Sequence, residues 1–139
     1  MAISFTSQHK KFKLLKSAAI KKWIDVVIKK EKRRLGEIHY TFVSDEELLE
    51  MNKQFLKHNT YTDIITFDYS EGKTVNGDIF MSIDRVKDNA SKFKTEFNDE
   101  LHRVIIHGVL HLCGYKDKTK KDASLMRKME ENSLSKRSF

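Results

Sequence analysis

Residues 100–117 read ELHRVIIHGVLHLCGYKD and combine the pattern of a buried helix with a pair of histidines at positions 107 and 111. Apolar residues occupy most positions between Leu101 and Leu112, which predicts a helix that is covered on most of its sides. Gly114 is a suitable end for this helix, because glycine adopts the left-handed conformation that reverses the chain. We therefore expect the helix to lie in the core and the residues after Gly114 to fold back over it.

The two histidines of this helix are spaced as metal ligands. His107 and His111 lie four residues apart, so their side chains share one face and can reach the same ion. Asp117 follows the chain reversal and is placed to be a third ligand, which gives the frame H-x3-H-x2-G-x2-D. Three protein ligands leave a fourth position for water, an arrangement typical of a catalytic zinc ion.

Other interpretations of this frame remain open. Histidines in helices are more often core or surface residues than ligands, so the pair could be structural. Two histidines and one carboxylate also suit iron(II) or nickel. The helix is zincin-like, but peptide hydrolysis is disfavoured, because Gly108 stands where the motif H-E-x-x-H has its general base.

The rest of the chain predicts alternating strands and helices in one domain, residues 1–139. Alternating β-branched and aromatic residues predict strands at residues 2–7, 37–43, 64–69 and 75–82. Helical spacing predicts helices at residues 12–33, 44–55, 82–92, 96–113 and after 119. The order β-α-β-α-β-β-α-α-α predicts an α+β fold, in which one small sheet of about four strands is packed with helices.

Local signals set several of these boundaries. Ser44 with Glu47 has the spacing of a capping box, and Thr119 is expected to cap the last helix. Gly36 is expected to stop the first helix, and Asn98 to cap the helix that carries the histidines. The apolar stripe of the first helix is predicted to consist of Phe12, Leu15, Ala19, Trp23 and Val27.

The charge of the chain is strongly positive and unevenly distributed. Lys and Arg number 27 against 20 Asp and Glu, which gives a net charge of +7. The excess gathers in the first quarter and after the histidine motif, and such a field attracts polyanions, above all nucleic acid. A solvated helix face is the alternative. The residues predicted to contact nucleic-acid phosphates are Lys16, Lys21, Lys29, Arg33, Lys116 and Lys118.

Composition excludes several classes of protein. The content of hydrophobic residues, 39%, argues against disorder, and no apolar run approaches the length that spans a bilayer. The first residues, MAISFTSQHKKFK, lack the apolar core of a secretory signal. Cys113 is the single cysteine, so an internal disulfide framework is excluded. We expect a cytoplasmic protein without a membrane partner.

The segment HGVLHLCGYKD resembles the signature H-G-x-L-H-L-x-G-Y-x-H of the YbeY family of bacterial ribosomal RNA maturation factors. The segments MNKQFLKHNTYTDIITF at 51–67 and NGDIFMS at 76–82 are similar to two further blocks of that family. The resemblance implies a metal-dependent endoribonuclease that prefers single strands. It also implies a role in ribosomal RNA processing, notably at the 3′ end of the small-subunit RNA, and in ribosome quality control.

The resemblance implies one Zn²⁺ per chain, bound by His107, His111 and Asp117, where the family usually has histidine at the third position. A carboxylate ligand makes the site more negative and the zinc a weaker Lewis acid. The family's arginine in L-N-x-x-Y-R falls on Leu56, and Lys57 and His58 are the nearest substitutes for its catalytic role.

Two functions from different classes follow. The first is the endoribonuclease, with single-stranded ribosomal RNA as substrate and the ribosome or its small subunit as partner. The alternative is a non-catalytic, basic RNA-binding factor of ribosome assembly, in which the metal only pins residues 114–117 against the helix.

Overall fold

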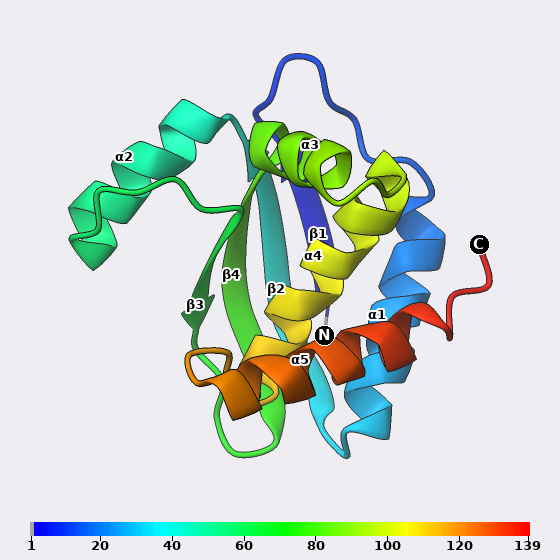
Figure 1. The fold of residues 1–139 in the computed structure, drawn as a ribbon. Coiled ribbons are helices and arrows are strands. Elements are labelled where there is room, and N and C mark those ends of the chain that lie inside the picture. The colour runs from blue at the N-terminus through cyan, green and yellow to red at the C-terminus, as the bar shows by residue number, and fades with distance from the viewer. Residues whose placement is uncertain (1) are drawn as a thin grey trace.

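The computed structural model describes residues 2–139, which form nine elements (Figure 1). In chain order they are β1 (Ala2–Ser7), α1 (Ser17–Lys30), β2 (Arg34–Val43), α2 (Asp45–Leu56), β3 (Ile64–Asp68), β4 (Thr74–Ser82), α3 (Ile83–Lys92), α4 (Phe97–Leu112) and α5 (Lys120–Leu134). The predicted order of strands and helices is confirmed. None of the helices in residues 2–139 combines the length and the apolar composition needed to cross a membrane.

The strands of residues 2–139 form one mixed sheet in the order β1-β2-β4-β3. β3 and β4 are antiparallel and form a hairpin. β2 is parallel to both of its neighbours, since α1 connects β1 to β2, and α2 with β3 connects β2 to β4. The predicted α+β class with a four-stranded sheet is confirmed.

The two faces of the sheet are covered differently. Successive side chains of a strand point to opposite faces, so Phe42 and Val43 of β2 lie on different sides. The side of Phe42 packs against α1 and α4 and holds the main core. The side of Val43 carries α2, and there Leu48 and Ile65 complete a smaller apolar cluster. Helix α4 also contacts α3 and α5, so it is covered on most sides, as its sequence predicts.

The first helix is shorter than its sequence pattern predicts. It begins at Ser17 rather than at Phe12, because Lys16 adopts the left-handed conformation with a φ of 59°. Leu15 of the predicted stripe is therefore exposed, and Phe12 reaches the core from outside the helix. The buried stripe of α1 consists of Ile20, Trp23, Ile24, Val27 and Ile28.

Two predicted helix boundaries are wrong. Gly36 does not stop α1; it lies inside β2, where a Cβ atom would come within 2.1 Å of Oδ1 of Asn76 on the neighbouring strand. Asn98 does not cap α4; the N-cap is Glu96, whose side chain makes no capping hydrogen bond. Tertiary packing thus sets the position of Gly36, whereas Asn98 lies exposed within the first turn of α4.

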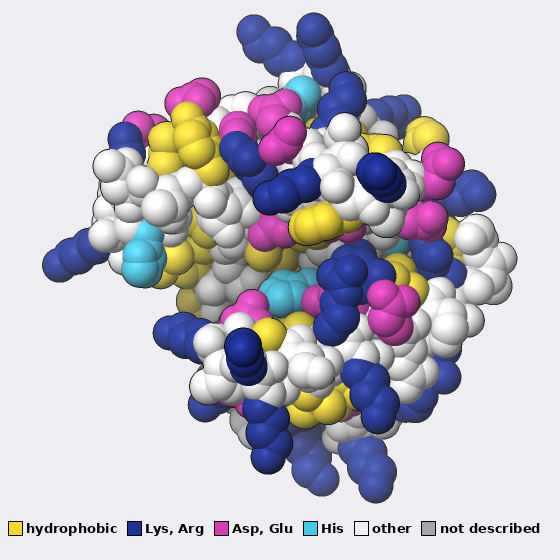
Figure 2. All heavy atoms as spheres, in the orientation of Figure 1, with side chains coloured by type: hydrophobic (Ala, Val, Ile, Leu, Met, Phe, Trp, Pro, Cys, Tyr) yellow, Lys and Arg dark blue, Asp and Glu magenta, His cyan; other side chains and the backbone are white. Residues whose placement is uncertain are grey.

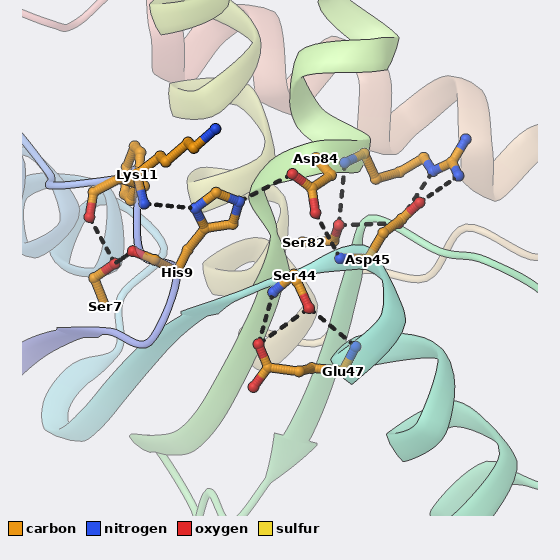
Figure 3. Close-up of polar contacts among 10 residues, drawn as sticks. Ser7, His9, Lys11, Ser44, Asp45, Glu47, Ser82 and Asp84 are labelled. Carbon is orange, nitrogen blue, oxygen red and sulfur yellow. Dashed lines mark hydrogen bonds and ion pairs between the residues drawn. The ribbon is translucent and has the colours of Figure 1, made fainter.

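Polar contacts tie the starts of α2 and α3 to the N-terminal segment (Figure 3). The predicted capping box is present, since Oγ of Ser44 accepts from the Glu47 N–H and the Glu47 carboxylate accepts from the Ser44 N–H, both at 3.2 Å. Asp84 accepts a hydrogen bond from the Asp45 N–H and contacts His9, each at 2.9 Å. These contacts fix α2 relative to α3.

His102 of α4 is a buried histidine whose surroundings disfavour the protonated form. It packs edge-on against the rings of Trp23 and Phe139, and its Nδ1 accepts a hydrogen bond from Arg137 at 2.8 Å. Burial, with the nearby charge of Arg137, lowers the pKa of His102 from 6.5 to about 4.

We expect this histidine to destabilise the protein in acid. Between pH 6.5 and about 4 the unfolded chain binds a proton at His102 that the folded chain does not. The free energy of unfolding therefore decreases as the pH is lowered through this range. The loss should reach up to about 3 kcal/mol. Urea unfolding of the parent and of His102→Asn, from pH 7 to pH 4, checks this, because groups common to both proteins cancel. A difference in stability that does not change with pH would contradict it.

Candidate metal centre

Helix α4 turns one polar stripe toward a cleft. Arg103, His107 and His111 follow at intervals of four residues and therefore share a face of the helix. All three line a cleft of about 700 Å³, whose other walls come from the end of α2 and the segment after it, from β3, from α3, from the turn after α4 and from α5. Figure 2 shows this hollow, with histidine side chains inside it and charged side chains at its edge. The predicted metal-binding face is therefore accessible.

The turn after α4 brings Asp117 back to this face. Gly114 has a φ of +106°, so the predicted left-handed glycine is confirmed. Two contacts from the α1–β2 connection hold the turn: Arg33 donates to the Cys113 carbonyl at 2.9 Å, and the Tyr115 hydroxyl donates to Glu31 at 2.7 Å. The reversal is therefore anchored on both sides of Gly114.

The spacing of His107 and Asp117 suits a shared ion. Nε2 of His107 lies 3.3 Å from Oδ2 of Asp117, and two ligands of a tetrahedral zinc ion are separated by about 3.4 Å. The ring of His111 is centred 6.3 Å from that of His107 and, within residues 2–139, makes no hydrogen bond or ion pair. Among residues 2–139, no three His, Cys, Asp or Glu side chains lie close enough together to hold a metal ion, and of the predicted ligands only His107 and Asp117 lie at ligand spacing.

Glu130 of α5 supports His107, and no sequence motif pointed to it. Oε2 of Glu130 lies 2.7 Å from Nδ1 of His107, and Oε1 accepts a hydrogen bond from Arg103 at 3.0 Å. When Nδ1–H of His107 is donated to a carboxylate, Nε2 keeps its lone pair for a metal ion, as is common behind metal-bound histidines. In the sequence, only helical spacing could have indicated that Glu130 is buried. It follows the buried Met126 by four residues and so lies on the buried stripe of α5.

The charges in the cleft shift the titration of its groups. Burial lowers the pKa of His107, but the hydrogen bond and charge of Glu130, together with Asp117, outweigh it and raise that pKa above its ordinary value. Burial raises the pKa of Asp63 and of Glu100, which line the same cleft. A proton would compete with a metal ion for His107, so a metal ion held there would be released as the pH falls.

Gly108 explains why the helix carries no glutamate next to its first histidine. It is buried against the sheet, and a Cβ atom there would lie 3.0 Å from both Ile64 and Ile79. A glutamate at this position would place an unpaired carboxylate in the core, which is strongly unfavourable. The general base of a zinc protease therefore has no room here.

The structure separates the two residues predicted to replace the family arginine. Leu56 and His58 line the cleft, so an arginine at position 56 would face it. Lys57 is not among the lining residues and ends α2 in the left-handed conformation. The cleft has other cations, of which Arg127 is the more exposed and Arg103 is held by two glutamates.

Of the six residues predicted to contact phosphates, only Lys118 lines the cleft. The other five lie elsewhere on the chain: Lys16, Lys21, Lys29, Arg33 and Lys116. Arg33 is engaged with the turn after α4. The cations of the cleft also face four carboxylates there, those of Asp63, Glu100, Asp117 and Glu130. The net positive field therefore comes from the surface outside the cleft.

Comparisons with known proteins agree with one another. The family model described as Endoribonuclease YbeY matches residues 3–138. Endoribonuclease YbeY of Cytophaga hutchinsonii is 53% identical over 138 residues, which are 99% of this chain and 96% of the relative. Endoribonuclease YbeY of Bacteroides thetaiotaomicron is 45% identical over 137 residues, which are 99% of this chain and 100% of the relative. The solution structure of TM1509 from Thermotoga maritima is 31% identical, with a TM-score of 0.70, and the match covers 96% of this chain and 87% of that one.

Proposed function

The chain belongs to the endoribonuclease YbeY family, and we propose that it is a metal-dependent endoribonuclease that cleaves single-stranded RNA. The observation that carries the proposal is the pairing of His107 with Asp117 at 3.3 Å in an open cleft, with Glu130 behind His107. His107, His111 and Asp117 would hold the ion, and zinc fits this set of two nitrogens and one oxygen. When bound, such an ion supplies Lewis-acid polarisation of a phosphate and activation of water near neutral pH.

The side chains around the ligands have separate tasks in this proposal. Glu130 holds the N–H at Nδ1 of His107, which keeps Nε2 free, and Arg103 compensates the buried charge of Glu130. Asp63, a carboxyl group whose pKa burial raises, can hold a proton beside the RNA.

Phosphate recognition is assigned to cations that are free to move. Lys118 and Arg127 line the cleft, and the side chain of Arg127 is 60% exposed with one distant partner, Glu131 at 4.0 Å. They take the place of the family arginine, since Leu56 carries no charge. The basic residues of the first quarter supply the long-range attraction for RNA, which should weaken steeply with salt.

We place the activity in the processing of ribosomal RNA, with the small subunit or its precursor as the partner. A cytoplasmic location follows from this role. The non-catalytic alternative, an RNA-binding assembly factor with a structural metal, is not favoured, because the relatives are named as endoribonucleases.

Cleavage of a labelled single-stranded RNA tests the proposal. The protein should cut the single strand and spare the same sequence annealed into a duplex; EDTA should stop the reaction and added Zn²⁺ should restore it. The 3′ end of the 5′ fragment shows whether water or the ribose 2′-hydroxyl attacks, since a 2′,3′-cyclic phosphate at that end arises only from attack by the 2′-hydroxyl. If the protein binds the RNA but does not cut it with any metal ion added, the proposed endoribonuclease activity is contradicted and the non-catalytic assembly factor is favoured.

A further inference from the structure

The last turn of α3 presents two uncharged side chains to the cleft. Asn89 and Phe93 lie four residues apart and are joined by a hydrogen bond from the Phe93 N–H to the Asn89 carbonyl at 2.9 Å, so they share a face. Both line the cleft that holds His107 and His111. The Phe93 side chain is 53% exposed although it is large and apolar.

Within residues 2–139, neither side chain is engaged in a hydrogen bond or ring contact of the fold. In the part of the chain that the structure describes, Phe93 contacts no other aromatic ring and the Asn89 amide makes no hydrogen bond. A single exposed phenylalanine is ordinary on a protein surface, but this ring lies in the cleft, next to a free amide. A flat apolar ring and an amide are the groups that recognise a nucleobase, by stacking and by hydrogen bonds to its edge.

Cations adjoin this pair in the sequence or line the same cleft. Lys92 and Lys94 flank Phe93 in the sequence and are both exposed. Lys118 and Arg127 reach the cleft from α5 and the turn before it. Aromatic rings that stack on bases, set among cations that track the phosphates, are typical of proteins that bind single-stranded nucleic acid.

We propose that Asn89 and Phe93 form a subsite for one unpaired nucleobase of the RNA substrate. Phe93 stacks on the face of the base and Asn89 hydrogen-bonds its edge. A base inside a duplex has its faces covered by neighbours and its edge paired, so it cannot enter. The subsite rests on the proposed function and adds to it a physical reason for the preference for single strands.

Binding measured without cleavage tests the subsite. Fluorescence anisotropy of a labelled single-stranded RNA, in EDTA, should show a Kd about tenfold higher for Phe93→Ala than for the parent, because one stacked base is lost. Phe93→Trp should restore binding. The matched control is Tyr69→Ala, which removes an aromatic side chain that is 58% exposed and does not line the cleft.

A substrate series locates the base. RNAs with one abasic position, moved stepwise along the strand, should show a single position at which the parent loses affinity and Phe93→Ala does not. Equal Kd values for the parent and Phe93→Ala, with an RNA that the parent cuts, would overturn the subsite and leave the proposed function intact. A parent that neither binds nor cuts RNA would overturn both.

Discussion

His111→Ala should lose both the bound metal and the cleavage of RNA. The ring of His111 lies on the same face of α4 as that of His107, and without it two protein ligands remain, too few for a stable zinc site. We expect the metal content to fall from about one ion per chain to near zero and the cleavage rate to fall about 100-fold or more. Plasma mass spectrometry of freshly purified protein and single-turnover cleavage of a labelled RNA measure the two effects.

The matched control is His39→Ala. His39 lies on β2, contacts Ser4 and Thr6 on β1 and does not line the cleft, so its loss should leave metal content and cleavage unchanged. If the parent contains iron or nickel in place of zinc, the assignment of the ligands would stand and the proposed zinc chemistry would not. A parent that takes up no metal, or a His111→Ala protein that keeps full metal and activity, would make the paired histidines structural.

The order of the elements could be predicted because the chain carries strong local signals for each of them. The box of Ser44 and Glu47 and the positive φ of Gly114 are consequences of a few neighbouring residues, and both are confirmed. The start of α1 depends instead on Lys16, a residue with no preference for the left-handed conformation that it adopts. Gly36 likewise depends on Asn76, a residue of another strand, which no local pattern reveals.

The candidate site likewise combines residues that the local sequence reveals with residues that only tertiary packing brings to it. His107, His111 and Asp117 lie within eleven residues, so their placement around one cleft could be predicted from helix spacing and one turn, although only His107 and Asp117 lie as close as 3.3 Å. Glu130 reaches His107 from another helix, and Asn89 and Phe93 reach the cleft from a third, so only the packing of α3 and α5 against α4 brings them together. Most of the predicted phosphate-binding residues lie outside the cleft, because net charge says nothing about which face of the molecule carries it.

Glu130→Ala should weaken metal binding and destabilise the fold together. Glu130 is 5% exposed and accepts hydrogen bonds from both Arg103 and His107, so its removal leaves a partly buried guanidinium with one partner fewer and a histidine without its acceptor. Breaking a buried pair of this kind costs about 3 kcal/mol or more, which lowers the Tm by about 10 °C in a chain of this size. Loss of the carboxylate behind a metal-bound histidine reduces metal affinity by about 10- to 100-fold.

Glu130→Gln separates the two effects. Glutamine keeps the size of the side chain, but its one acceptor oxygen serves either Arg103 or His107 and its NH₂ group faces the other donor, so metal affinity should still fall. Competition with a chelating dye measures that affinity, and ¹⁵N shifts of the His107 ring report whether Nδ1 still carries the proton. The control is Glu131→Gln, since the side chain of Glu131 also pairs with Arg103 but is 59% exposed and does not contact His107. Unchanged affinity and an unchanged tautomer in Glu130→Gln would show that His107 is oriented by packing alone, and Glu130 would then serve stability rather than the metal centre.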